Sequence, residues 1–192
     1  MAEAELTARI KSGDRDAFNE LVREYESRVI NAAYGMLSDK EDAYDAAQEV
    51  FIRVYKSIDS FKGQSSLTTW IYRITVNICN DILRKRQRSA KTISITQDEN
   101  EGENTQVLEI ADSAPTPEEA AEQSEAQKAL MAAIADLSTD YKNVIMLCDL
   151  QGMSYDETSK ILKIPTGTVK SRLNRARNAL RKKLMEKREL FR

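Results

Sequence analysis

The sequence contains no histidine and only two cysteines, Cys79 and Cys148, far apart in the chain. This excludes a Cys/His zinc site and a histidine-based catalytic triad, and we expect both thiols to be small buried apolar groups. Six glycines and three prolines are too few for the turns of an all-β fold. Since no apolar run approaches the ~20 residues of a membrane span and no signal peptide is evident, we expect a cytoplasmic protein that does not insert into membranes.

Charge is strongly segregated along the chain, although the net charge is only −2. Residues 92–127 carry ten acidic residues and no Lys or Arg, whereas residues 168–192 carry ten basic residues and two acidic ones. The stretch RKRQRSAK, residues 84–91, adds five basic residues. This pattern indicates nucleic acid as the partner of the basic segments. The acidic stretch lacks periodicity, which predicts a flexible linker over residues 91–125.

Apolar residues recur at helical spacing on both sides of the linker, which predicts an all-α fold of two small helical domains, residues 1–90 and 126–192. The predicted helices are 15–37, 42–58, 67–88, 126–137, 139–150, 155–163 and a final basic helix that follows the turn 164–167. Ser154 and Glu157 form a capping box, and Gly152 ends the helix before it. Either Thr166 or Thr168 is suited to cap the final helix.

The last two predicted helices have the layout of a helix-turn-helix. On a helical wheel an apolar stripe comprises Val169, Leu173, Ala176, Leu180 and Leu184. The opposite face carries Ser171, Asn174, Arg175, Asn178 and Lys182. The stripe is flanked by Lys170, Arg172, Arg177 and Arg181. Arg and Asn suit base edges in a major groove and flanking cations suit phosphates. A merely solvated charged face is the alternative, but the helix-turn-helix spacing favours binding of duplex DNA.

The helix 67–88 carries a single polar stripe, formed by Thr69, Arg73, Asn77, Asn80 and Arg84. Trp70, the only tryptophan, lies along its edge. Cations can follow a phosphate backbone, amides can bind base edges, and an aromatic ring can stack on a base, so the stripe suits single-stranded nucleic acid. The alternative is a solvated stripe beside a tryptophan that belongs to the core. The helix alone does not decide between them.

Two long stretches resemble one family. DAYDAAQEVFIRVYKSIDSFKGQSSLTTWIYRITVN resembles region 2 of bacterial RNA polymerase sigma factors of the extracytoplasmic-function group, and DLSTDYKNVIMLCDLQGMSYDETSKILKIPTGTVKSRLNRARNAL resembles their region 4. The matches occur in the right order and cover nearly the whole chain outside the linker. The resemblance implies that residues 1–90 bind core RNA polymerase and recognise and melt the minus-ten promoter element. It implies that residues 126–192 recognise the minus-thirty-five element.

The resemblance also implies individual roles. Minus-thirty-five contacts would come from Gly167, Thr168, Lys170, Ser171, Arg172, Asn174 and Arg175, of which Asn174 stands at a variable position. A loop would hold a base flipped from the non-template single strand, and the following helix would line that strand, through Phe61, Lys62, Gly63, Ser65, Ser66, Trp70, Arg73, Asn77, Asn80 and Arg84. A coiled coil of the largest polymerase subunits would contact Asp45, Gln48, Glu49 and Ile52, for which an ordinary solvated face is the alternative.

The expected partners are core RNA polymerase, promoter DNA and a cognate anti-sigma factor, often membrane-anchored. The acidic linker either mimics RNA near the polymerase active site or serves as a tether. No catalytic residue, metal or cofactor is expected, because no phosphate-binding glycine loop or convincing carboxylate pair is present. The main alternative is a stand-alone helix-turn-helix regulator with residues 1–90 as its sensor, but such a sensor does not need a single-strand surface.

Overall fold

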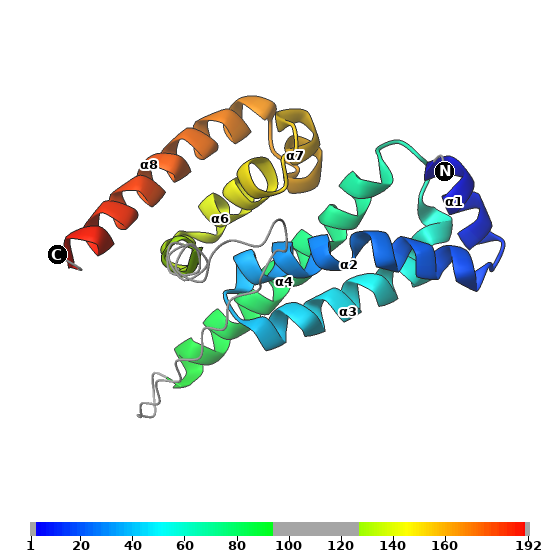
Figure 1. Ribbon diagram of the computed structural model, residues 1–192, viewed down its shortest axis with the longest axis horizontal. Helices are drawn as coiled ribbons and strands as arrows, with labels where there is room; N and C mark the ends of the chain where they lie inside the picture. Colours follow the sequence, from blue (N-terminus) through cyan, green and yellow to red (C-terminus); the bar gives the residue numbers. More distant parts are fainter. Residues whose placement is uncertain (1–2, 94–126, 191–192) are drawn as a thin grey trace, which may run out of the picture.

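The computed structural model describes residues 3–93 and 127–190, with side chains over 3–89 and 127–186. These residues form helices and no strand, which confirms the all-α prediction. The first group comprises α1 (Glu3–Lys11), α2 (Arg15–Leu37), α3 (Lys40–Ser57), the 3₁₀ turn η1 (Ile58–Ser60) and α4 (Leu67–Ile93). The second comprises helical residues 127–135, α6 (Thr139–Ile145), the π-helical turn η2 (Met146–Leu150), α7 (Tyr155–Leu162) and α8 (Thr166–Leu190) (Figure 1).

Short polar residues set the helix boundaries of the first group. The carboxylate of Asp14 accepts hydrogen bonds from the first-turn amides of α2, at Asp16 and Ala17. Helix α2 ends where Ser38 adopts a left-handed conformation at φ 59°, and Asp39 then caps α3. The predicted interruption at residues 38–39 is therefore confirmed. Helix α1 was not predicted, and α4 extends to Ile93, five residues beyond the predicted end.

The core of the first group lies between α2, α3 and α4, which run side by side in Figure 1. Its fully buried side chains include Leu21, Val29, Val50, Val54, Leu67 and Ile71. These residues belong to the apolar stripes predicted by helical periodicity. Burial of a side chain of this size contributes about 1.5–3 kcal/mol, so these stripes fix which polar faces remain on the surface.

The second group begins and ends its helices largely as predicted. The Ser154–Glu157 capping box is present at the start of α7, and Gly152 has φ +65° one residue beyond Gln151, the C-cap of the preceding helix. The predicted helix 139–150 keeps its length, but its last five residues are π-helical. The predicted threonine cap of α8 is wrong. Thr166 is already helical, and the carbonyl of Pro165 accepts the first amide hydrogen bonds.

The two groups pack against each other through a shared apolar core. Met146, Leu147, Met153 and Ile161 from the second group join the core of the first. Gly35 of α2 makes room for this contact, because a Cβ atom there would lie 2.2 Å from the sulfur of Met146. No helix within residues 3–93 and 127–190 has the length and apolar character to span a bilayer. The predicted linker falls mostly outside the described residues.

Candidate nucleic-acid interface

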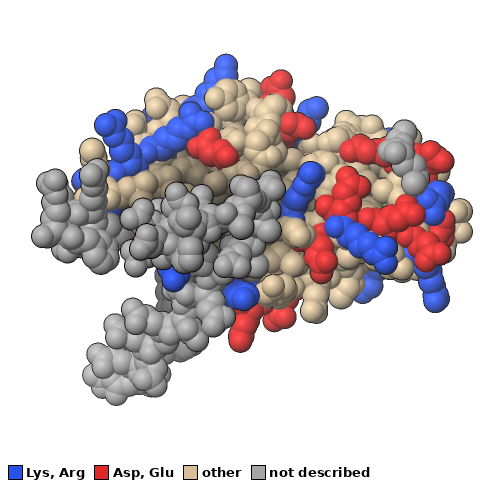
Figure 2. Space-filling model, in the orientation of Figure 1, with Lys and Arg blue, Asp and Glu red and all other residues tan. Residues whose placement is uncertain are grey.

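Helix α8 presents the predicted polar face to solvent. Val169, Leu173 and Ala176 are buried against the other helices of the second group. The opposite residues are exposed, namely Ser171, Asn174, Arg175, Asn178 and Lys182. Figure 2 shows Lys and Arg side chains gathered over this helix, while acidic side chains gather at the end of the molecule that holds α1. The arrangement places donors and positive charge on one continuous helix face.

Three arginines of α8 differ in their existing ion pairs. Arg172 is half-buried and lies 3.1 Å from the carboxylate of Asp140. Arg177 makes two hydrogen bonds to Asp149, at 3.0 and 2.5 Å, and this carboxylate raises the pKa of the guanidinium. Arg175 is exposed, and within the described residues no ion pair engages it. Among these three, Arg175 is therefore the side chain best placed to bind a base edge.

The first turn of α8 is open to a ligand. Gly167 is exposed, and a Cβ atom there would have nothing within 4 Å. Thr168 is half-buried, Ser171 donates to the carbonyl of Thr168 at 3.1 Å, and Lys170 lies 5.7 Å from the ring centre of Tyr155. Amide groups at a helix start favour phosphate, so this turn is suited to hold a phosphate group.

The polar stripe of α4 is only partly available. Asn77 is exposed and Arg73 half-buried, whereas Thr69 is buried. The amide of Asn143, in α6, donates to the side-chain carbonyl of Asn80 at 3.4 Å. Arg84 is exposed and bonds Asp81 three residues earlier, a surface pair of the kind that contributes only a few tenths of a kcal/mol. Asn77 is thus the most accessible amide of the stripe.

The loop 61–66 leads from η1 into α4. Lys62 and Gly63 are exposed, Ser65 and Ser66 are half-buried, and Gly63 has φ +68°, which glycine adopts without strain. Phe61 and Trp70 are 8% and 7% exposed, and their ring centres lie 5.2 Å apart. Of the two interpretations of Trp70 left open by the sequence, this burial favours a ring that belongs to the core. The ring is core, because it packs on Phe61 beneath the loop.

Helix α3 exposes a second surface. Asp45, Gln48 and Ile52 are exposed and Glu49 is half-buried, 2.7 Å from Arg53. Tyr44 and Tyr55 lie on the same side and are 40% and 54% exposed. The sequence analysis missed both tyrosines, although the spacing 44, 48, 52 and 55 could have identified one helix face. Large exposed apolar groups beside charges are typical of a protein–protein contact.

The two thiols take no part in these surfaces. Burial raises the pKa of Cys79 to about 12, so its thiol is neutral and unreactive at physiological pH. Cys148 is half-buried, 3.3 Å from the Thr158 hydroxyl, and desolvation raises its pKa as well. Buried apolar character was predicted for both, and it holds fully for Cys79 and partly for Cys148.

Comparisons with known proteins agree on one family. Residues 21–89 match the family model for sigma-70 region 2, and residues 127–180 match that for sigma-70 region 4. The chain is 35% identical over 184 residues to the ECF RNA polymerase sigma-E factor of Haemophilus influenzae, covering 96% of each chain. It is 37% identical over 177 residues to the ECF RNA polymerase sigma factor SigW of Bacillus subtilis, covering 92% of this chain and 94% of that one.

Two solved structures share the fold. One is CnrH in complex with the cytosolic domain of CnrY, with a TM-score of 0.68, 23% identity, and coverage of 97% of this chain and 99% of that chain. The other is the sigma factor RpoE in complex with the anti-sigma factor NepR from Bartonella quintana. It has a TM-score of 0.69, 24% identity, and coverage of 88% and 96%. At these identities the likeness establishes the fold.

Proposed function

Because the chain belongs to the extracytoplasmic-function group of RNA polymerase sigma factors, we propose that it acts as a transcription initiation factor. It is an alternative sigma factor that directs RNA polymerase to promoters. The observation that carries this function is the pairing of regions 2 and 4, in order, in one chain. A stand-alone regulator would need only the helix-turn-helix. The protein works where RNA polymerase does, in the cytoplasm, and no catalysis of its own is required.

Residues 126–192 recognise the minus-thirty-five element through α8. The helix enters the major groove, where Arg175 and Asn174 face bases and Lys170 and Arg172 face phosphates. Gly167, Thr168 and Ser171 hold the backbone near the start of the helix. The exposure of Arg175 and the open first turn of α8 support this assignment. Arg172 first has to leave Asp140, an exposed carboxylate that holds it only weakly.

Residues 1–90 recognise and open the minus-ten element. The loop from Phe61 to Ser66, including Lys62, Gly63 and Ser65, holds a base flipped from the non-template strand, and Arg73, Asn77 and Arg84 line the path of that strand. Unstacking and flipping a base costs a few kcal/mol, which contacts in the loop offset, so melting is driven by binding and not by hydrolysis. Trp70 supports the loop from beneath. Asn80 reaches the strand once its bond to Asn143 breaks.

The exposed face of α3 binds core RNA polymerase. Asp45, Gln48, Glu49 and Ile52 form this face, and we add Tyr44 and Tyr55 to it because both rings are exposed on the same side. Aromatic and aliphatic groups with charges at the rim are the usual composition of a protein interface. Two structural neighbours are in complexes with CnrY and with the anti-sigma factor NepR. A comparable anti-sigma factor is the second protein partner we propose.

A pull-down with purified core RNA polymerase tests this function against the regulator alternative. We expect the chain to co-elute with core enzyme and to bind duplex promoter DNA specifically only in that complex. If the chain did not bind core enzyme and bound a palindromic duplex by itself, it would be a stand-alone regulator instead. Binding at two salt concentrations in each arm separates specific contacts from general attraction to phosphate.

A further inference from the structure

Helix α1 holds both ends of the loop 61–66. The ammonium group of Lys11, its last residue, donates a hydrogen bond to the main-chain carbonyl of Phe61 at 2.6 Å. The carboxylate of Glu3, its first residue, accepts a hydrogen bond from the main-chain amide of Leu67 at 3.2 Å. Phe61 begins the loop and Leu67 begins α4. One nine-residue helix therefore ties the loop at its entry and at its exit.

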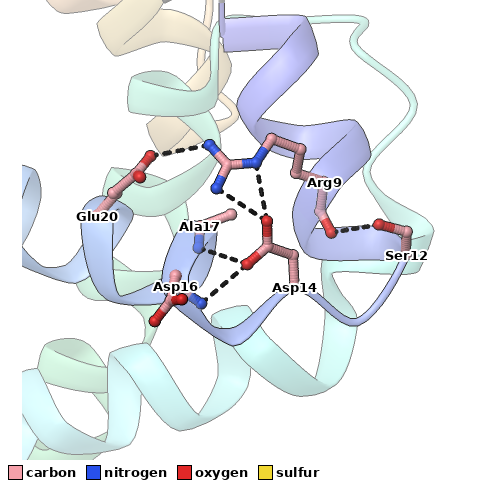
Figure 3. A network of polar contacts seen from close by, with 6 residues as sticks. All are labelled: Arg9, Ser12, Asp14, Asp16, Ala17 and Glu20. Atoms are coloured by element: carbon pink, nitrogen blue, oxygen red, sulfur yellow. Dashed lines mark hydrogen bonds and ion pairs between the residues drawn. The ribbon is translucent and has the colours of Figure 1, made fainter.

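Helix α1 is itself fixed to the rest of the first group. Leu6, Thr7 and Ile10 are buried, and α1 lies beside η1 and the start of α2 in Figure 1. At the corner between α1 and α2, Arg9 donates hydrogen bonds to the carboxylates of Asp14 at 2.8 Å and Glu20 at 3.2 Å (Figure 3). Asp14 caps α2 in the same network, and its amide hydrogen bonds and Arg9 lower its pKa. Buried apolar residues and this polar network thus hold α1 against α2.

The middle of the loop has little support of its own. Lys62, Gly63 and Gln64 are exposed, and a Cβ atom at Gly63 would have nothing within 4 Å. Beyond the tip, Ser66 bonds the hydroxyl of Thr69 at 2.8 Å and belongs to the start of α4. The conformation of the exposed tip is therefore determined mainly by where its two ends are held.

We propose that Lys11 and Glu3 are positioning residues for recognition of the minus-ten element. They act through the main chain of Phe61 and Leu67, setting the width and direction of the loop that receives an unpaired base. This inference rests on the proposed function of the loop. It adds a part of the chain, residues 3–11, that precedes the segment matched to region 2 at residues 21–89.

Each bond suits a positioning role physically. An ammonium–carbonyl bond is charge-assisted and therefore stronger than a neutral one. A carboxylate at the first amide of α4 satisfies one of the donors that a helix start leaves unpaired, and it complements the helix dipole. Because a flipped base needs its contacts within a fraction of an ångström, releasing either end weakens capture of the base more than it weakens the fold.

The test compares Lys11→Met with Arg15→Met in complete holoenzyme. Both substitutions remove one positive charge near the same corner, and Arg15 is exposed with no hydrogen bond to the loop, so general attraction to DNA changes equally. For Lys11→Met we expect open-complex formation to fall about tenfold relative to Arg15→Met, near the lower end of the range for loss of a charged hydrogen bond. We also expect weaker preference for the flipped base, with unchanged binding to core enzyme and to the minus-thirty-five duplex.

Two further variants separate positioning from folding. Lys11→Arg retains a charged donor and is expected to recover most of the activity, and Glu3→Gln is expected to reproduce the defect in base preference. Equal behaviour of Lys11→Met and Arg15→Met would overturn the proposal. So would a uniform loss of minus-thirty-five binding, polymerase binding and opening, because that result indicates a structural role.

A measurement on the free protein tests the role of Lys11 and Glu3 separately from the proposed function in transcription. Amide hydrogen exchange over residues 61–67 is expected to be faster in Lys11→Met and Glu3→Gln than in Arg15→Met, whether or not DNA is present. If the unsubstituted holoenzyme opened no promoter, the proposed function would fail. The exchange result would still test whether Lys11 and Glu3 hold the ends of the loop. If promoters opened but exchange and base preference did not change, the positioning role alone would be refuted.

Discussion

The contact between Gly35 and Met146 gives a quantitative test of how the two helical groups pack. Gly35 lies inside α2, and an added Cβ atom would sit 2.2 Å from the sulfur and 2.3 Å from the terminal methyl carbon of Met146, which is 2% exposed. In a helix interior, Gly→Ala alone stabilises by about 1 kcal/mol. Overpacking a buried site costs about 1–3 kcal/mol. Since the clashing atoms are the flexible end of an unbranched side chain, which can shift, we take the lower limit of about 1 kcal/mol for this clash.

The expected free-energy changes follow from these two contributions. Gly35→Ala should leave the free energy of unfolding nearly unchanged, because the clash offsets the gain in helix propensity. In a Met146→Ala background the clash disappears, so the same substitution should stabilise by about 1 kcal/mol. The double-mutant cycle should therefore give a coupling energy of about 1 kcal/mol between residues far apart in sequence.

Denaturant unfolding followed by circular dichroism measures all four proteins of the cycle, and Trp70 fluorescence follows the first group separately. Met146→Ala should lower the stability, Gly35→Ala should leave it nearly unchanged, and the double variant should be more stable than Met146→Ala alone. If Gly35→Ala stabilised the protein equally in both backgrounds, the sulfur of Met146 would not lie against α2. The packing of the two groups described above would then be incorrect.

Three other expectations concern single residues. Ala at Arg175 should cost about 1–3 kcal/mol of the preference for the correct minus-thirty-five sequence. Ala at Arg177, which is already paired with Asp149, should weaken binding to all DNA sequences alike. Competition binding against mutated elements measures both effects. Asn77→Ala should leave polymerase binding intact and reduce permanganate reactivity in the bubble, and unchanged reactivity would count against the single-strand role. Ser154→Ala should cost about 1 kcal/mol at neutral pH. Hydrogen bonds from Ser154 lower the pKa of Glu157 below its usual value. Their stabilisation is therefore present above the unfolded-state pKa and fades as pH falls through the folded-state pKa, and a cost independent of pH would contradict this.

Local patterns predicted most of the helices and their faces. The buried stripe through Val169, Leu173 and Ala176 follows from periodicity, and the Ser154–Glu157 box follows from capping chemistry. Such signals involve residues a few positions apart. They indicate which face of a helix is buried, without indicating which distant element covers it.

Long-range contacts account for what the sequence did not predict. The sequence left open whether Trp70 belongs to the core, and the partial cover of Asn80 depends on Asn143, 63 residues away. Helix α1 was not predicted. Its last and first residues, Lys11 and Glu3, form hydrogen bonds with the main chain of residues 50 and 64 positions away in the sequence. Each of these features requires the positions of elements, which a pattern in one segment does not contain.

Run-off transcription with purified core RNA polymerase on a promoter library tests the central claim most directly. Core enzyme alone should give little specific transcript, and addition of the chain should yield start sites from templates that share two elements at a fixed spacing. Ala at Arg175 should disturb selection at the upstream element and Ala at Asn77 should reduce opening at the downstream one. If the chain produced no polymerase-dependent transcript from any template, it would not act as a sigma factor.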